Sequence, residues 1–154
     1  MHLSTSSAAP GVESFIPPTK KLKLLSGKKE TVTPAPNVSA IILAADHGEL
    51  MRSKKPVVLH ECAGLQLIAH AVRLALQIEP HSIILVTRPE TQEAIRTIVE
   101  ESFPTSAASF TFALQEKTGG SREAVRAGLA AVPPDTQQVV ILPGNMPLLR
   151  LESL

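Results

Sequence analysis

Aromatic side chains, cysteine and net charge are all scarce in this chain of 154 residues. There are four Phe and no Tyr or Trp, so the core has to be aliphatic, and nucleic-acid binding by stacking on Tyr or Trp is excluded. The single cysteine, Cys62, excludes an intrachain disulfide and a zinc site built from several cysteines. A formal net charge of +1 provides no long-range field that would attract DNA. The sequence therefore predicts no nucleic-acid partner.

Long apolar runs are also missing. The longest unbroken run, Ala40–Ala45, has only six residues, which is too short to cross a bilayer. The N-terminus has no apolar stretch of the kind found in secretory signals. We therefore expect no membrane partner and a cytoplasmic protein.

Charge and proline divide the chain near residue 38. Residues 1–38 hold five Lys, two Glu and five of the thirteen Pro, with few apolar residues to bury. This composition predicts a disordered tail over 1–38 and a globular unit over 39–154. Within the tail, Lys20–Leu25 is basic and partly apolar, so it is either a solvated segment or a weak docking or membrane-surface element.

Residues 39–154 alternate short branched-aliphatic runs with stretches of helical periodicity. The order β-α-β-α-β-α-β predicts an α/β fold, a three-layer Rossmann-like arrangement around a parallel sheet. Ligands of such sheets bind beyond the carboxyl ends of the strands, so the loops 46–58, 115–121 and 143–147 are the candidate site. The predicted strands are Val38–Ala45, Ser82–Thr87, Phe110–Leu114 and Gln138–Leu142, and the predicted helices are Leu65–Ile78, one opened by Pro89 and one capped by Ser121.

Three stretches in these loops resemble nucleotidyltransferases. Leu43–Ser53 followed by Pro56–His60 is similar to the signature L-A-A-G-x-G-T-R-M, spacer, P-K. Leu114–Ser121 resembles the L-Q-x-x-x-x-G-T segment that reads the base, and Leu142–Leu149 resembles a strand ending in G-D-x-P-L.

The first motif is most similar to that of N-acetylglucosamine-1-phosphate uridylyltransferases. In that family the P-K element continues as V-L-H into an A-G segment, here Ala63–Leu67. Molybdenum-cofactor nucleotidyltransferases and methylerythritol-phosphate cytidylyltransferases share the later motifs. The resemblance covers about residues 39–154, the whole predicted globular part.

The resemblance implies transfer of UMP from UTP to N-acetylglucosamine-1-phosphate, with release of pyrophosphate. It also implies a Mg²⁺ cofactor, whose carboxylate ligand falls on Asn145. Catalysis of this kind is mostly positioning and charge neutralisation. The positions implied to bind the nucleotide are Ala44, Ala45, Gly48, Gln115, Gly120 and Ser121.

The chain departs from the family at the charged positions. The signature Gly and Thr are Asp46 and Glu49, and the family Arg and Lys fall on Leu50 and Val57. Asn145 replaces the magnesium carboxylate by a neutral oxygen ligand. Losing one charge-stabilising group costs about 10²–10³ in rate, so the sequence predicts impaired transferase activity.

Several alternatives stay open at this point. A shifted register could bring Lys55 to the phosphates. The domain could instead be a non-catalytic nucleotide-binding or scaffolding pseudoenzyme. It could also be a truncated product, because Leu148–Leu154 resembles the beginning of a further helix. An incomplete sheet would then leave an edge open to self-association.

Overall fold

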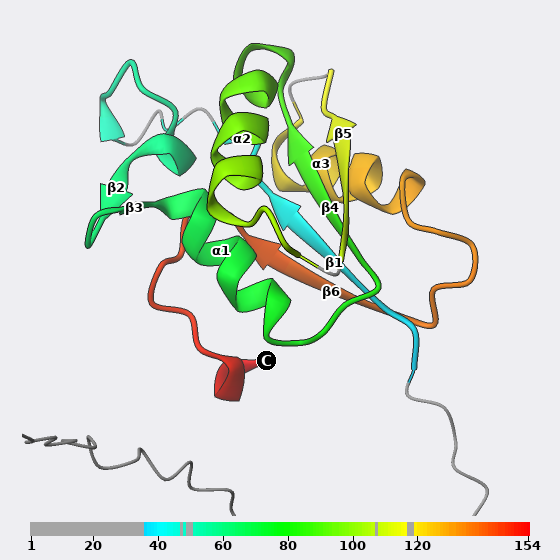
Figure 1. Cartoon of the computed structure of the whole chain (residues 1–154). Helices are drawn as coiled ribbons and strands as arrows, with labels where there is room; N and C mark the ends of the chain where they lie inside the picture. Colours follow the sequence, from blue (N-terminus) through cyan, green and yellow to red (C-terminus); the bar gives the residue numbers. More distant parts are fainter. Residues whose placement is uncertain (1–35, 47, 49–50, 107, 117–118) are drawn as a thin grey trace, which may run out of the picture. The chain divides into compact units, whose positions relative to one another are not determined.

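The computed structural model describes residues 36–154 except 47, 49–50, 107 and 117–118. It confirms the α/β fold, in which a parallel sheet with strand order β5-β4-β1-β6 lies between helices (Figure 1). The sheet consists of β1 (Val38–Leu43), β4 (Ser82–Thr87), β5 (Ser109–Leu114) and β6 (Gln138–Pro143). The helices are α1 (Leu67–Leu76), α2 (Pro89–Ser102) and α3 (Gly120–Ala130).

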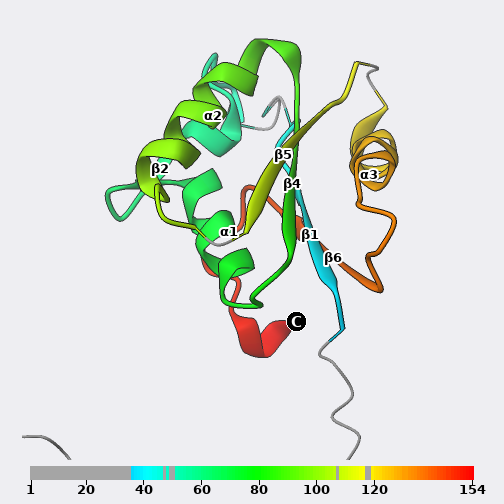
Figure 2. The same ribbon diagram turned by 45° about the vertical axis from the view of Figure 1, so that its right-hand side comes forward.

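Strand β1 is the centre of the sheet and pairs with a parallel neighbour on each side. Ser39 lies opposite Ser82 of β4, and Val38 lies opposite Gln138 of β6. The chain first builds outward from β1 through β4 to β5, and then returns across the sheet to place β6 on the other side of β1. Figure 2 shows the result, with α1 and α2 on one face and α3 on the other.

Aliphatic side chains fill both sides of the sheet, as the scarcity of aromatics requires. Alternate residues of a strand point to opposite faces, so Ile42 and Leu85 join Val72 of α1 in one cluster. Ile41 and Val86 belong to a smaller cluster on the α3 side. Among the described residues, no helix is both long and apolar enough to cross a membrane.

Several predicted element ends were wrong. Leu65 and Gln66 do not belong to α1 but form β3 (Leu65–Gln66), which pairs antiparallel with β2 (Glu61–Cys62). This hairpin turns through Gly64, whose φ of +77° is accessible to glycine without strain. The short hairpin thus takes residues that helical periodicity alone assigns to the helix.

Three further predictions need correction. The cap of α3 is Gly119, and Ser121 lies in the first turn of the helix rather than before it. Leu148–Leu154 contains only a short 3₁₀ helix, η3 (Leu151–Ser153). The first strand ends at Leu43, although the Ala44 amide still donates to the Val86 carbonyl at 2.8 Å. The boundary proposed at residue 38 stays a prediction, since 1–35 lie outside the described residues.

Gly128 lets α3 lie close against the sheet. A Cβ at this position would come within 2.6 Å of Ile41 Cγ2 and 3.0 Å of Val86 Cγ2. Both of these side chains are fully buried in the α3-side cluster, so neither can move without disturbing the core. The small residue therefore fixes the distance between α3 and the two central strands.

We expect Gly128→Ala to destabilise the protein even though alanine is the better helix former. Overpacking costs about 2 kcal/mol, whereas the helix-propensity gain is about 1 kcal/mol, so the net loss in the free energy of unfolding is about 1 kcal/mol. Urea denaturation measures this loss. Ala130→Leu, which enlarges an exposed residue of the same helix, is the control, and an equally stable or more stable Gly128→Ala would contradict the packing argument.

Candidate functional site

The carboxyl ends of the four parallel strands meet at one edge of the sheet. The chain leaves β1 into residues 44–48, and it leaves β6 into Gly144 and Asn145 (Figure 1). Arg88 follows β4 directly, and Gln115 follows β5 directly. Because all four strands run the same way, residues far apart in the sequence are brought to this single edge.

The loops after β1 and β6 touch through their backbones. The Gly144 amide donates to the Leu43 carbonyl at 2.9 Å. A Cβ on Gly144 would lie 2.7 Å from that same carbonyl oxygen and 3.2 Å from Val58 Cγ1. Glycine is therefore required here, and Asn145, the position implied to hold magnesium, is placed directly beyond this contact.

The loop after β1 turns on Asp46 and Gly48. The Gly48 amide donates to Asp46 Oδ1 at 3.0 Å, so a side chain of the loop satisfies a backbone donor of the loop. Gly48 has a φ of +70°, and a Cβ there would lie 2.4 Å from Val57 Cγ2. Val57 is 7% exposed and begins the 3₁₀ helix η2 (Val57–Leu59). Leu50, at the family Arg position, lies outside the described residues.

Arg88 joins this loop to β4, and sequence analysis missed it. Its Nε–H donates to the Ala45 carbonyl at 2.9 Å, across a separation of 43 residues. The Arg88 backbone is extended and precedes Pro89, the first residue of α2, where proline is favoured. A basic residue immediately after a buried strand, at the candidate edge, was the available signal.

Gln115 and Gly120 lie on the β5 side of the same edge. Gln115 is 5% exposed. Its backbone amide donates to the Thr87 carbonyl at 2.8 Å, and its side-chain Nε2 donates to the Gly120 carbonyl at 3.4 Å. Gly120 and Ser121 are exposed in the first turn of α3. The structure thus joins Arg88 to Ala45 and Gln115 to Gly120, while Asn145 follows β6 on the far side of β1.

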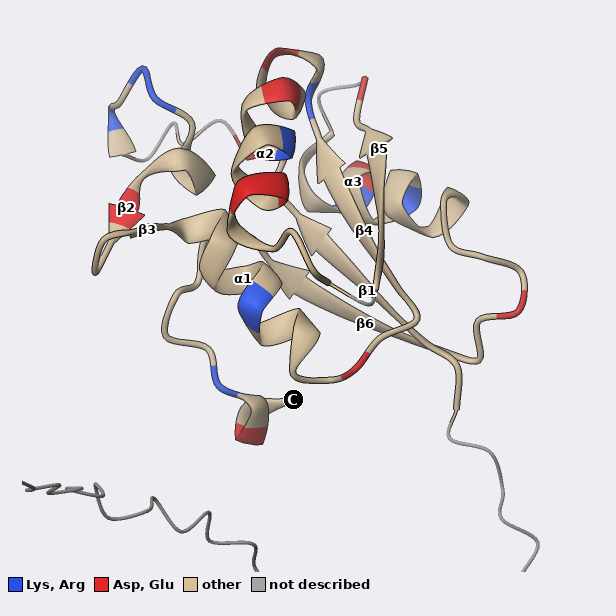
Figure 3. Cartoon of the chain, viewed as in Figure 1, with Lys and Arg blue, Asp and Glu red and all other residues tan. Residues whose placement is uncertain are grey.

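Basic residues collect on the loop that precedes η2 (Figure 3). Arg52, Lys54 and Lys55 are all exposed there. The Lys55 amide donates to Ser53 Oγ at 3.1 Å, and His60 Nε2 donates to the Lys55 carbonyl at 3.2 Å. These bonds fix the backbone of Lys55 in the loop, and the shifted register that would turn its amine to the phosphates stays a prediction.

The described residues at this edge do not form a good magnesium site. Mg²⁺ prefers carboxylate oxygens, whereas Asn145 offers a neutral amide, and the Asp46 carboxylate already accepts the Gly48 amide. Among the described residues there is no group of three or more His, Cys, Asp or Glu that could hold a metal ion. No chemical step can therefore be assigned to a metal from these side chains.

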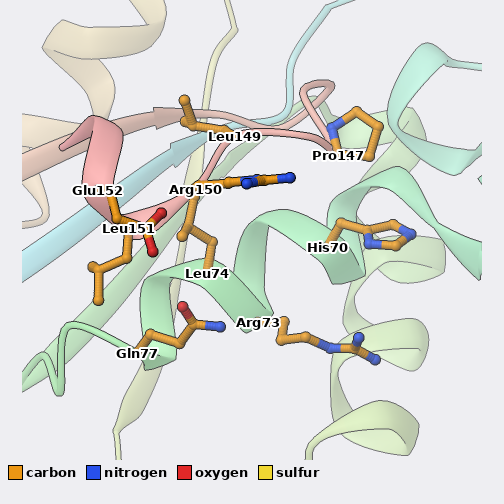
Figure 4. Close-up of a pocket in the computed structure, with 9 residues that line it drawn as sticks. All are labelled: His70, Arg73, Leu74, Gln77, Pro147, Leu149, Arg150, Leu151 and Glu152. Atoms are coloured by element: carbon orange, nitrogen blue, oxygen red, sulfur yellow. The ribbon is translucent and has the colours of Figure 1, made fainter.

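A cavity of about 500 Å³ lies elsewhere, between α1 and the C-terminal segment (Figure 4). None of the residues predicted to bind a nucleotide lines it. The strand-end edge is thus a different place from this cavity. The lining residues are His70, Arg73, Leu74, Gln77, Pro147, Leu149, Arg150, Leu151 and Glu152.

Comparison with known proteins agrees with this geometry. Residues 40–154 match the family described as the MobA-like NTP transferase domain. The bifunctional protein GlmU of Corynebacterium aurimucosum is 35% identical over 121 residues, which are 77% of this chain and 24% of that protein. The chain thus spans about a quarter of the length of the curated relatives it matches.

Solved structures show the same fold. The 4-diphosphocytidyl-2C-methyl-D-erythritol synthase of Anaerococcus prevotii superposes with a TM-score of 0.61 at 22% identity, covering 77% of this chain and 48% of that one. Rv0371c of Mycobacterium tuberculosis, solved in complex with manganese, has a TM-score of 0.53 at 18% identity, covering 74% and 53%. A divalent metal is therefore found in at least one structure of this fold.

We expect Arg88→Ala to loosen the loop after β1, because the Ala45 carbonyl loses its charged donor. Amide hydrogen exchange at Ala44 and Gly48 should become faster, and Arg88→Lys should restore protection only in part because lysine lacks the planar fork. Arg126→Ala, which removes an exposed arginine of α3, is the control. Unchanged exchange in Arg88→Ala would show that the bond does not position the loop.

Proposed function

Because the chain belongs to the family of MobA-like NTP transferase domains, we propose that the strand-end edge binds the nucleoside part of a nucleotide, and that nucleotidyl transfer is largely lost. Val57 is the observation that carries this proposal. The resemblance places the family lysine at this position, but the side chain here is apolar, 7% exposed and packed against Gly48. Charge neutralisation at the phosphates is the main catalytic contribution in phosphoryl transfer, and this residue cannot supply it.

Binding of the nucleoside would depend on a different part of the edge, the segment after β5, where the Gln and Gly of the family motif are present as Gln115 and Gly120. Gln115 is held between the Thr87 carbonyl and the Gly120 carbonyl, and the resemblance gives this segment the role of reading the base. Ala44 and Ala45, which the resemblance also places at the nucleotide, are small residues directly after β1. We propose UTP and uridine as the preferred ligands, following the uridylyltransferase resemblance.

An active sugar-phosphate uridylyltransferase is the second candidate. The 35% identity to a GlmU protein and the retained Gln115 and Gly120 favour it. In that case UMP would pass from UTP to N-acetylglucosamine-1-phosphate with Mg²⁺ present. Asn145 would then have to serve as a metal ligand without a carboxylate, which weakens binding of a hard dication.

Pyrophosphate release separates the two candidates. With UTP, N-acetylglucosamine-1-phosphate and Mg²⁺, we expect the full chain to show no turnover above that of the Asn145→Ala variant. Calorimetry with uridine, cytidine, guanosine and their triphosphates should show binding to at least one of them. Turnover clearly above the variant would contradict the loss of transfer, and binding to none of the six ligands would contradict the proposed function.

We also propose that the β6 edge supports self-association. Val139 and Ile141 are 38% and 42% exposed, and β6 pairs with a neighbour only through β1 among the described residues. Unpaired strand edges with apolar side chains favour pairing with another chain. The measurable consequence is a molecular mass that rises with protein concentration.

Sedimentation velocity tests this expectation with a pair of charge variants. Ile141→Lys should make the mass independent of concentration, because it places a charge in the exposed apolar patch. Gln138→Lys adds the same charge to the same strand, on the side where alternation puts Val140 and Leu142, and should have a smaller effect. A full chain that stays monomeric at every concentration would refute the proposal.

A further inference from the structure

We infer that this site selects nucleosides over magnesium-bound nucleoside triphosphates, because the loop after β1 carries its own anion. The inference rests on the proposed function and concerns the same edge of the sheet. The anion is the carboxylate of Asp46, at the position where the resemblance places the first glycine of the signature.

The Asp46 carboxylate accepts a hydrogen bond from the backbone amide to which a phosphate would otherwise bind. Backbone amides of glycine loops at strand ends bind phosphates, because they are donors that no side chain shields. Here the Gly48 amide already donates to Asp46 Oδ1 at 3.0 Å. A phosphate at this amide would have to displace the carboxylate and then remain close to its negative charge, which is repulsive.

The positions where the resemblance places the family Arg and Lys carry no positive charge that could balance the phosphates. Val57 is buried against Gly48, and Asn145 is neutral. Arg52, Lys54 and Lys55 are exposed on the preceding loop, where salt screens their field. The Arg88 guanidinium is bonded at the neighbouring residue, with its Nε–H on the Ala45 carbonyl, and its single positive charge does not balance the four negative charges of a triphosphate.

The base end of the site is organised without phosphate. Arg88 Nε–H holds the Ala45 carbonyl at 2.9 Å, and Gln115 Nε2 holds the Gly120 carbonyl at 3.4 Å. Both interactions are internal to the protein, so the geometry around the base does not depend on a metal or on a bound phosphate. Affinity should therefore reside in the base and ribose, which uridine and UTP share.

Calorimetry of the full chain with uridine, UMP and UTP, each in Mg²⁺ and in EDTA, tests the inference. We expect uridine to bind at least as tightly as UTP. Replacing Mg²⁺ by EDTA should change neither affinity by more than about twofold. UTP binding about tenfold more tightly than uridine in Mg²⁺, with the advantage lost in EDTA, would overturn the inference and leave the proposed function intact. Binding of none of the three ligands would overturn the inference, and absence of binding by cytidine, guanosine and their triphosphates as well would overturn the proposed function.

Asp46→Asn isolates the charge from the hydrogen bond. Asparagine keeps a side-chain oxygen that can accept the Gly48 amide but carries no charge. We expect the affinity for UTP to rise about tenfold relative to uridine, whose affinity should not change. Asp135→Asn is the matched control, since Asp135 is exposed and binds Asn37 before the amino end of the sheet. An unchanged ratio of UTP to uridine affinity in Asp46→Asn would overturn the inference alone.

Discussion

The parallel pairing of β1 with both β4 and β6 is the constraint on which the rest of the structure depends. It forces the connection from β5 to cross the sheet, and this crossing moves α3 to the face opposite α1 and α2. It also brings four strand ends to one edge, where Ala45, Arg88, Gln115 and Gly144 follow the four strands. At Gly128 and Gly144 the backbone lies close to the central strands, and an added Cβ would lie 2.6 Å from Ile41 Cγ2 and 2.7 Å from the Leu43 carbonyl oxygen.

Within this edge, recognition of a base and neutralisation of phosphates are physically separate tasks. Hydrogen bonds between strand ends organise the base side, and they involve Arg88 and Gln115. The phosphate side depends on charge, and there the described residues present Asp46, Val57 and Asn145. Because the two sides share no side chain, the second can change without disturbing the first. The proposed function depends on this separation, because it requires a chain of the NTP transferase family to keep an organised base side without the groups that stabilise transfer.

Much of the fold could be predicted from the sequence, because buried parallel strands consist of short runs of branched aliphatic residues that are easily recognised. Ser82–Thr87 was predicted with both ends correct. The β2–β3 hairpin was missed, since two-residue strands carry no periodicity of their own. Ser121 was misassigned as the cap because propensity favours serine, whereas Gly119 is the cap and Gly120 already begins the helix. The misplaced cap and the missed hairpin both lie beside the end of a helix, where local rules compete with tertiary contacts.

The site was harder to predict, because its decisive contacts join residues far apart in the sequence. The motifs indicated Ala45 and Gln115, but no motif could indicate that Arg88 binds the Ala45 carbonyl 43 residues away. Sequence analysis also did not predict that Asp46 accepts a hydrogen bond from the Gly48 amide. It treated the aspartate in place of glycine only as an added negative charge. In the structure the Asp46 carboxylate also accepts a hydrogen bond from the Gly48 amide, and under the proposed function it would compete with a phosphate for that donor. An acid at this position changes what the loop can bind, and a neutral residue there would not.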